Sequence, residues 1–504
     1  MLLALVFAPD LSADLDRILA AKELKNAVVA VRVEKMDGAV LYSRGAEIRA
    51  MPASNQKLLT CAYALDKLGA DFRPRTRFWK LEDRVAVESS GDPMMTFGQL
   101  REVRKKLELD GKLPVYVRQA YNPGTGPSWE WDDLPNKYAA PISAFTVDRG
   151  SFEIWAENGK LFYMPQNYGT RVSHINSRGS VRVRYSPNAG HSSVTGKLPT
   201  VRTRLDTLAL REPWKAAGSI LGGPVLTGFS VPTRDPDLVV DGAPLREILK
   251  ECLTKSDNNI AEHLLLLAAK SEGPLSEEPW KVAGERLTRF LSETVGIPEE
   301  QIEPSDGSGL SRHNLITARA ITTLLRWAIK QPTAEIWLAS LAIPSAMGTL
   351  EKRLAGSTFR GKTGSLTGAC SLSGYLTTAD GETLVVSMIF NNYRGSSVRI
   401  RDIQDDFVRR LEKIVKLPLL MLTPPQKQAR DVPETGCSGS AGTVLAQSLF
   451  HESDLTNAFH RSSDWNRRRG YDRDGLASRP GHDRRDESDH AALPGKQRMA
   501  VYLR

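Results

Sequence analysis

The stretch from Pro52 to Leu68, PASNQKLLTCAYALDKL, decides the fold. A proline at its start, an unbroken apolar run and Gly69 directly after it predict a buried helix. Ser54 and Lys57 are three residues apart, so they share one face of that helix. A lysine with a lowered pKa can take the proton of a serine hydroxyl, and the N–H groups at a helix start favour developing negative charge. The alternative is a serine N-cap with a solvated lysine one turn on, because short motifs often match by chance.

A second motif, Ser256-Asp257-Asn258, falls at a break between two predicted helices. There a serine hydroxyl and an amide side chain would project together toward the same space. The alternative interpretation is a helix cap, since Ser, Asp and Asn are all favoured at that position.

A third motif, Lys362-Thr363-Gly364, lies within a predicted strand after Gly361. A lysine there can bind a substrate carboxylate, and the threonine can donate to the same group. Gly364 would let a substrate backbone approach the strand closely. The alternative is a solvated lysine on an edge strand.

In this order, Ser-x-x-Lys, Ser-x-Asn and Lys-Thr-Gly form the signature of penicillin-recognising serine acyl-enzymes. Ser54 and Ser256 are 202 residues apart (256 − 54), whereas class A β-lactamases keep these motifs close together. The large insertion resembles the D-alanyl-D-alanine carboxypeptidase/endopeptidase family of class C low-molecular-mass penicillin-binding proteins. Other stretches resemble that family too: Ser90–Pro93, Trp129–Asp133 with Tyr138, Asp306–Arg312, Gly348–Leu350 and Ser373–Tyr375. The similarity spans residues 11–415, although the insertion is short for the family and the C-terminal segment has no counterpart in it.

The resemblance implies a substrate and a set of roles. The substrate would be a peptidoglycan stem peptide ending in D-Ala-D-Ala, with β-lactam antibiotics as covalent inhibitors and no metal or organic cofactor. Ser54 would attack, Lys57 would accept its proton, and Ser256 would relay a proton to the leaving amine. The oxyanion would lie against the backbone N–H groups of Ser54 and Ser365. The substrate-binding residues implied are Asn258, Lys362, Thr363, Gly364 and Ser365.

By the same resemblance the fold class is α+β: a helix-flanked antiparallel sheet with a large β-rich insertion. We expect residues 11–71 and 235–422 to form the acyl-transfer domain and residues 72–234 to form the inserted β-rich module. Residues 423–504 lose apolar periodicity, and we interpret them as a disordered tail or the product of a shifted reading frame.

Local patterns predict the individual elements. Asp37-Gly38 predicts a hairpin between strands at 27–33 and 39–43. Apolar periodicity predicts helices at 12–24, 97–109, 208–217, 244–250, 260–269, 282–295, 317–329 and 398–415. Further strands are expected at 115–117, 181–185, 359–366, 371–377 and 383–390, the last two turning at Asp380-Gly381.

Composition limits the other classes of function. The chain has 504 residues and a net charge of +9, with Lys and Arg scattered, which gives nucleic-acid binding little support. Its four cysteines show no metal-site or disulfide-scaffold spacing, and no segment is long and apolar enough to span a membrane. The short apolar stretch 1–8 is either a truncated export signal or a meaningless extension. Because the implied substrate, peptidoglycan, lies outside the cytoplasmic membrane, we expect a periplasmic or cell-wall-facing enzyme.

Two alternatives remain open from the sequence. A β-lactamase would share the acylation chemistry, but no deacylating glutamate can be assigned. A catalytically silent cell-wall-binding protein would keep the fold, although the retention of the motif residues argues against it. The oligomeric state and the third residue of the stem peptide are not determined by the sequence.

Overall fold

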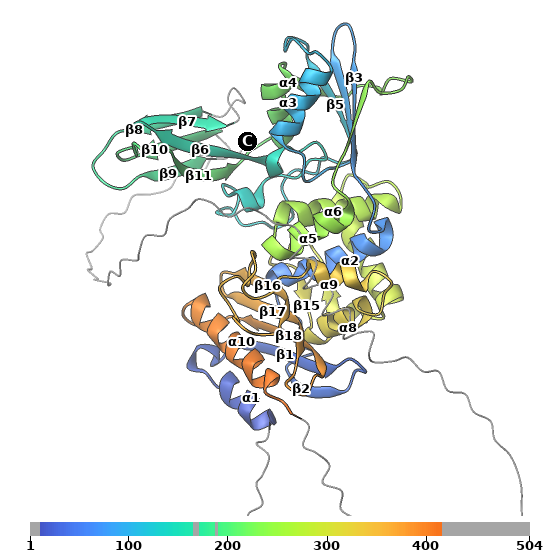
Figure 1. Cartoon of the computed structure of the whole chain (residues 1–504), viewed down its shortest axis with the longest axis vertical. Helices are drawn as coiled ribbons and strands as arrows, with labels where there is room; N and C mark the ends of the chain where they lie inside the picture. The colour runs from blue at the N-terminus through green and yellow to red at the C-terminus, as the bar shows by residue number, and fades with distance from the viewer. Residues whose placement is uncertain (1–10, 165–170, 187–189, 416–504) are drawn as a thin grey trace, which may run out of the picture. The chain divides into compact units, whose positions relative to one another are not determined.

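The computed structural model describes residues 11–164, 171–186 and 190–415; the apolar stretch 1–8 and the segment after residue 415 lie outside the described residues. A five-stranded antiparallel sheet in the order β16-β17-β18-β1-β2 unites both ends of the described chain (Figure 1). Its strands are β1 (Val28–Lys35), β2 (Val40–Arg44), β16 (Arg360–Leu366), β17 (Ala369–Thr377) and β18 (Thr383–Asn391).

Helices cover both faces of this sheet. On one face, α1 (Leu11–Leu19) and α10 (Ser397–Glu412) pack against each other and the strands, burying a core that includes Leu15, Phe390 and Phe407. On the other side lies a helical group (Figure 1). Its members are α2 (Gln56–Leu68), α5 (Leu245–Lys255), α6 (Asn258–Ser271), α7 (Pro279–Arg289), α8 (Ala318–Ala328) and α9 (Ala334–Ser340).

The two faces of β17 differ in chemistry because successive side chains alternate. Leu372 and Leu376 belong to the apolar core beneath α1 and α10. Ser371 and Ser373 are fully buried on the opposite face, which is turned toward the start of α2. A strand buried on both faces therefore presents hydroxyl groups to the helix that carries the first motif.

The segment between α2 and α5 is rich in strands. Its first sheet has the order β12-β5-β4-β3-β13, and two three-stranded sheets, β11-β6-β7 and β8-β10-β9, follow. The strands are β3 (Arg75–Lys80), β4 (Val85–Ser89), β5 (Val115–Gln119), β6 (Ser151–Glu157), β7 (Lys160–Met164), β8 (Arg171–Ile175), β9 (Arg182–Ser186), β10 (His191–Thr195), β11 (Thr203–Ala209), β12 (Val225–Thr227) and β13 (Leu238–Asp241). Helices α3 (Phe97–Lys106) and α4 (Gly218–Leu221) accompany them, and the remaining short strands are β14 (Ile302–Glu303) and β15 (Leu315–Ile316).

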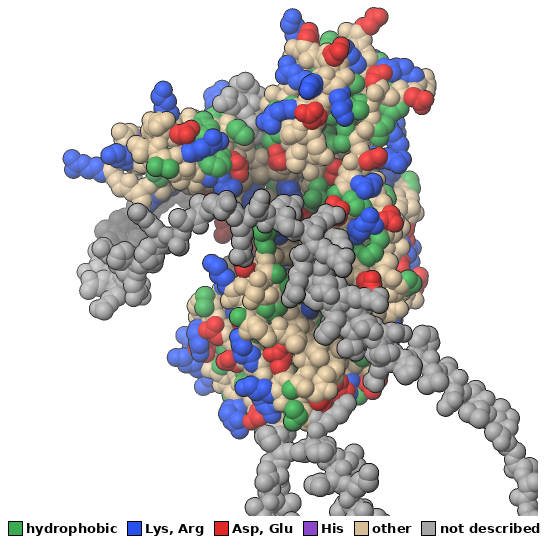
Figure 2. Space-filling view, in the orientation of Figure 1, with side chains coloured by type: hydrophobic (Ala, Val, Ile, Leu, Met, Phe, Trp, Pro, Cys, Tyr) green, Lys and Arg blue, Asp and Glu red, His purple; other side chains and the backbone are tan. Residues whose placement is uncertain are grey.

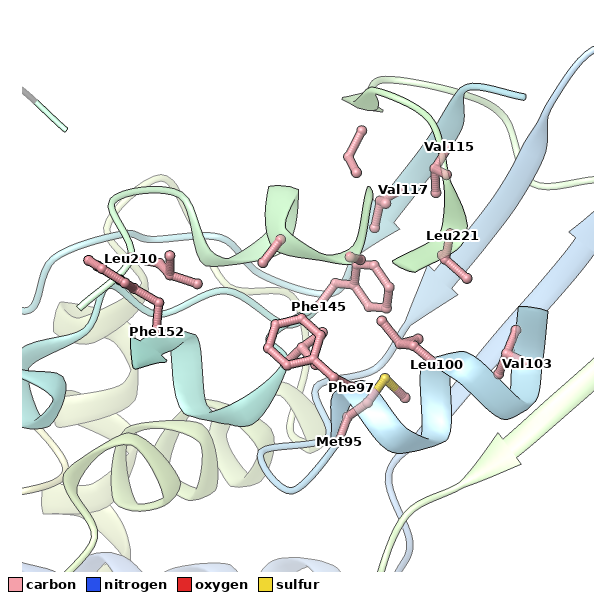
Figure 3. Packing of buried hydrophobic residues seen from close by; sticks show 14 of the residues in the cluster. Met95, Phe97, Leu100, Val103, Val115, Val117, Phe145, Phe152, Leu210 and Leu221 are labelled. Carbon is pink, nitrogen blue, oxygen red and sulfur yellow. The ribbon is translucent and has the colours of Figure 1, made fainter. Parts of the chain in front are cut away.

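This strand-rich segment has its own hydrophobic core. Figure 3 shows Phe97 and Leu100 of α3 pointing toward Phe145, near Val117 of β5. The core continues to Phe152 of β6, so it joins the first sheet to the β11-β6-β7 sheet. We infer that the segment folds around this core as a module.

The predicted α+β class, with a helix-flanked antiparallel sheet and a β-rich insertion, is confirmed. One predicted helix was wrong, and one helix was missed. Residues 208–217 do not form one helix, because β11 runs to Ala209 and a 3-10 turn covers Pro213–Ala217. The helix α9 was not predicted, since seven residues carry too little periodicity.

The expected boundary after residue 234 requires adjustment. Strand β13 pairs with β3 from Leu238 to Asp241, so these residues extend the first sheet of the inserted segment. We therefore propose that the inserted module runs to Asp241.

The charged side chains and the cysteines are distributed as the sequence predicts. Figure 2 shows Lys and Arg interspersed with Asp and Glu over the visible face. Cys61, Cys252 and Cys370 are buried free thiols, while Cys437 lies outside the described residues. Across the described part of the chain, no helix has the length and apolar character that a membrane crossing requires.

Candidate active site

Ser54 lies on a 3-10 turn, Ala53–Asn55, that leads directly into α2. Two serines of β17 hold this turn: Ser371 Oγ donates to the Pro52 carbonyl at 2.6 Å, and the Asn55 side chain donates to Ser373 Oγ at 2.7 Å. Both bonds are buried, so each is strong relative to a solvated one. The central sheet thus fixes the position of the turn that carries the Ser54 hydroxyl.

Gly364 packs closely against its neighbours on the side where a Cβ would lie. A Cβ at this position would lie 2.1 Å from Ser371 Oγ, 2.8 Å from the Pro52 carbonyl oxygen and 3.0 Å from Ser54 N. The space beside Gly364 is therefore filled by the Ser371 side chain and by the turn that carries Ser54, so a substrate backbone cannot approach on that side. The glycine is required because β16 and the Ser54 turn pack in direct contact.

We expect Gly364→Ala to slow acylation of Ser54 by at least about tenfold, because the added methyl group displaces the Ser54 turn from β16. Stopped-flow measurement with a fluorescent penicillin gives the rate. Gly98→Ala is the matched control, since Gly98 is exposed on α3 and its Cβ would meet nothing closer than 3.5 Å. Equal acylation rates in Gly364→Ala and the wild type would show that the turn tolerates the methyl group.

Lys57 is fully buried and its amine contacts three oxygens. Nζ lies 2.9 Å from Ser54 Oγ, 2.7 Å from Asn258 Oδ1 and 2.7 Å from the Ser308 carbonyl oxygen. Burial lowers the pKa of Lys57 below its usual range because the charged amine loses hydration. The alternative of a solvated lysine behind a serine cap is wrong, and the geometry is that of a base beside a nucleophile.

The three residues of the second motif, Ser256-Asp257-Asn258, have two different structural roles. Ser256 ends α5 in the left-handed region, with φ 63°, which turns its hydroxyl toward Lys362. Asp257 is the N-cap of α6 and accepts from Ile260 N, as the capping interpretation expected. Asn258 accepts from Lys57 and donates its Nδ2 to the Tyr138 carbonyl at 3.0 Å. Capping thus explains Asp257 but not the residues on either side.

Lys362 lies on β16, an edge strand, yet its side chain is 0% exposed. Its Nζ donates to Ser256 Oγ at 2.8 Å and to the Thr363 carbonyl at 2.8 Å. Burial, and next the nearby charge of Lys57, lower the pKa of Lys362 well below its usual range. The alternative of a solvated edge-strand lysine is wrong. Thr363 contributes its carbonyl here, while its side chain, one position along the strand, projects to the other side.

A cleft of about 850 Å³ opens at Ser54. Among the predicted residues, Ser54, Asn258 and Ser365 line it, whereas Lys57 and Lys362 are fully buried and Ser256 is half-buried. The cleft also presents four charged side chains and two tyrosines: Glu130, Asp132, Asp133, Arg312, Tyr138 and Tyr393. Arg312 pairs with both oxygens of Glu130, at 2.5 and 2.9 Å, so Asp132 and Asp133 are the carboxylates left to face a ligand, with Asp133 accepting from Tyr138.

Sequence reasoning missed the groups that support these side chains. The hydroxyls of Ser371 and Ser373 and the carbonyl of Ser308 had no assigned role, although the stretch around Ser308 stood out by family resemblance. Alternation along β17 could have placed the two serines on one face. Nothing local in the sequence indicates that a carbonyl 251 residues away accepts from Lys57.

Comparison with known proteins finds relatives along most of the chain. The chain is 29% identical over 444 residues to the D-alanyl-D-alanine carboxypeptidase of Actinomadura sp. (strain R39), a match that covers 77% of this chain and 82% of the relative. It is 26% identical over 399 residues to D-alanyl-D-alanine carboxypeptidase DacB of Haemophilus influenzae, covering 68% and 81%. The crystal structure of penicillin binding protein 4 from Haemophilus influenzae has the same fold, with a TM-score of 0.67 at 22% identity over 80% of this chain and 100% of that one.

The family itself follows from the match along the sequence. Residues 11–414 match the D-Ala-D-Ala carboxypeptidase 3 (S13) family, so the match covers both the central sheet and the inserted segment. This agrees with the family that the three motifs predicted. The chain therefore belongs to the D-Ala-D-Ala carboxypeptidase 3 (S13) family of serine peptidases.

Proposed function

We propose that this protein is a serine D-Ala-D-Ala carboxypeptidase/endopeptidase that cleaves peptidoglycan stem peptides through an acyl-enzyme and is acylated by penicillin. The observation that carries the proposal is the buried Lys57 amine 2.9 Å from Ser54 Oγ, at the floor of an open cleft. A desolvated amine next to a hydroxyl is the arrangement that activates a serine nucleophile.

The first half of the reaction forms the acyl-enzyme. Ser54 Oγ attacks the carbonyl carbon of the penultimate D-alanine while its proton passes to Lys57. The negative oxygen that develops lies at the start of α2, where the Ser54 N–H and the Ser365 N–H are proposed to donate to it. Collapse of this intermediate breaks the peptide bond, and the departing amine of the last D-alanine needs a proton.

We propose that the proton that Lys57 took from Ser54 reaches this amine through Ser256. Its hydroxyl accepts from Lys362 Nζ, so the lysine holds the Ser256 oxygen and leaves its hydrogen free to be donated. Asn258, which lines the cleft and contacts Lys57, is proposed to hold the acyl chain. Water then attacks the ester, which releases the shortened stem peptide and regenerates Ser54.

The cleft wall favours a substrate that carries a positive charge. Asp132 and Asp133 line the cleft beside Ser54, and the one cation among the lining side chains, Arg312, already pairs with Glu130. A free amine on the stem peptide would therefore find an unpaired carboxylate nearby. Because peptidoglycan lies outside the cytoplasmic membrane, we also propose a periplasmic or wall-facing location, which fractionation of the native host can test.

The proposal is tested by incubating the protein separately with a fluorescent penicillin and with a D-Ala-D-Ala pentapeptide. We expect a stable covalent label and release of free D-alanine. Acetylation of the pentapeptide's side-chain amine should raise KM, because it removes the charge that faces Asp132 and Asp133. Rapid turnover of the label would indicate a β-lactamase instead, and no labelling would indicate a silent wall-binding protein.

A further inference from the structure

The carbonyl group of Ser308 belongs to the DGSGLS stretch, residues 306–311, and contacts the amine of Lys57. Ser308 is fully buried, so this oxygen does not face substrate. Its role follows from counting the donors and acceptors around Lys57.

A neutral lysine amine has two N–H groups and one lone pair, and the lone pair is what removes the Ser54 proton. The Ser308 carbonyl and the Asn258 side-chain oxygen can only accept, whereas the Ser54 hydroxyl can also donate. The orientation of the Asn258 amide is fixed, because its Nδ2 donates to the Tyr138 carbonyl. The two N–H groups are therefore directed to Asn258 and Ser308, which leaves the lone pair aimed at the Ser54 hydroxyl.

Glu262 fixes the position of the Ser308 carbonyl. Its Oε1 accepts from Ser308 N at 2.9 Å, and its Oε2 accepts from Gly307 N at 2.9 Å and from Trp280 Nε1 at 3.0 Å. Glu262 is fully buried and lies four residues after Asn258 on α6, so both side chains project from the same face.

The same backbone segment is held from the opposite side by α2. Thr60, three residues after Lys57, donates its hydroxyl to the Gly307 carbonyl at 2.7 Å. The segment is thus held between the helix that carries the base and the helix that carries Asn258. A shift in either contact would move the Ser308 carbonyl relative to Lys57.

We propose that Glu262 is a positioning residue: by holding Gly307 and Ser308 it directs the Lys57 lone pair at Ser54. This rests on the proposed function, since it presumes that Lys57 deprotonates Ser54. It predicts that acylation slows when the carboxylate is lost even though the residue touches neither substrate nor Lys57.

A purely electrostatic role of Glu262 would act through the pKa of Lys57 instead. Burial lowers the pKa of Lys57, and the carboxylates of Asp306 and Glu262 oppose that shift. Removing the charge of Glu262 would lower the pKa of Lys57 further, which enlarges the neutral fraction of the amine but also makes it a weaker base. Charge loss alone should therefore shift the pH profile of acylation, whereas a displaced Ser308 carbonyl should lower the rate at every pH, so the pH profile is measured for each variant.

The test is Glu262→Gln, whose amide must place an NH₂ group against a backbone or indole N–H donor. We expect the rate constant for acylation at saturating penicillin to fall about 10–100-fold, with the half-saturating concentration unchanged within about twofold. Because the rate constant reports only folded molecules, a loss of stability alone lowers the amplitude and not the rate. Thr60→Val releases the same segment from the α2 side and should slow acylation in the same way if Glu262→Gln does not fold.

The matched controls are variants of a second hydrogen bond between α2 and α6. Tyr63 is buried on α2 and donates to Glu272, the exposed C-cap of α6, so Tyr63→Phe and Glu272→Gln break a hydrogen bond between the same two helices without touching residues 306–311. Both should acylate at the wild-type rate even where they lower Tm. Wild-type rates in Glu262→Gln and Thr60→Val, or equal slowing in the controls, would overturn the positioning role. If the wild type itself takes no label, the proposed function fails, and the positioning role with it.

Discussion

Ser54→Ala is expected to abolish covalent penicillin labelling while the protein stays folded. Ser54 is the nucleophile in the proposed reaction, and within the described structure its hydroxyl is the one that contacts Lys57. Removing it leaves the base without a group to activate, so acylation should fall below detection and not merely slow. Intact-mass spectrometry after incubation with penicillin measures the adduct directly.

Folding of the Ser54→Ala variant is checked by thermal unfolding. The turn around Ser54 is held through Pro52 and Asn55, so its Tm should match that of the wild type within a few degrees. A full-occupancy adduct on this variant would exclude Ser54 as the nucleophile and would direct attention to Ser256.

Lys362→Ala is expected to lower kcat/KM by roughly 10²–10³-fold for D-Ala-D-Ala peptides and to slow acylation by penicillin similarly. The sequence favoured a role in holding the terminal carboxylate. The structure instead buries the amine and places it on Ser256 Oγ, so we expect the loss to fall on proton delivery to the leaving amine.

A pair of substrates separates these two roles of Lys362. If Lys362 acts through Ser256, a peptide with a free carboxylate and its amidated analogue should lose activity by the same factor. If Lys362 binds the carboxylate, the loss should appear with the acid and be nearly absent with the amide. Lys362→Met serves as a control for the cavity that alanine leaves, because it keeps an apolar stem of similar length.

The sequence alone was sufficient to predict the architecture and the catalytic helix. The Asp37-Gly38 turn between two strand-like runs predicted the hairpin of β1 and β2, and the three motifs together with the long insertion between the first two predicted the family. These features are local, since turn chemistry and residue spacing depend on neighbours within a few positions. The helix α9 was not predicted, because its seven residues are too few to show a helical period.

The environment of each catalytic group was decided by tertiary structure. Lys57 contacts Asn258 and Ser308 only because α2, α6 and residues 306–311 meet in space, and its burial follows from that packing. Gly364 is required by its contact with the Ser54 turn, not by its own strand. Hydrogen bonds and desolvation act between groups that are close in space, so a motif can identify the reacting residues while only the folded chain sets their pKa and their orientation.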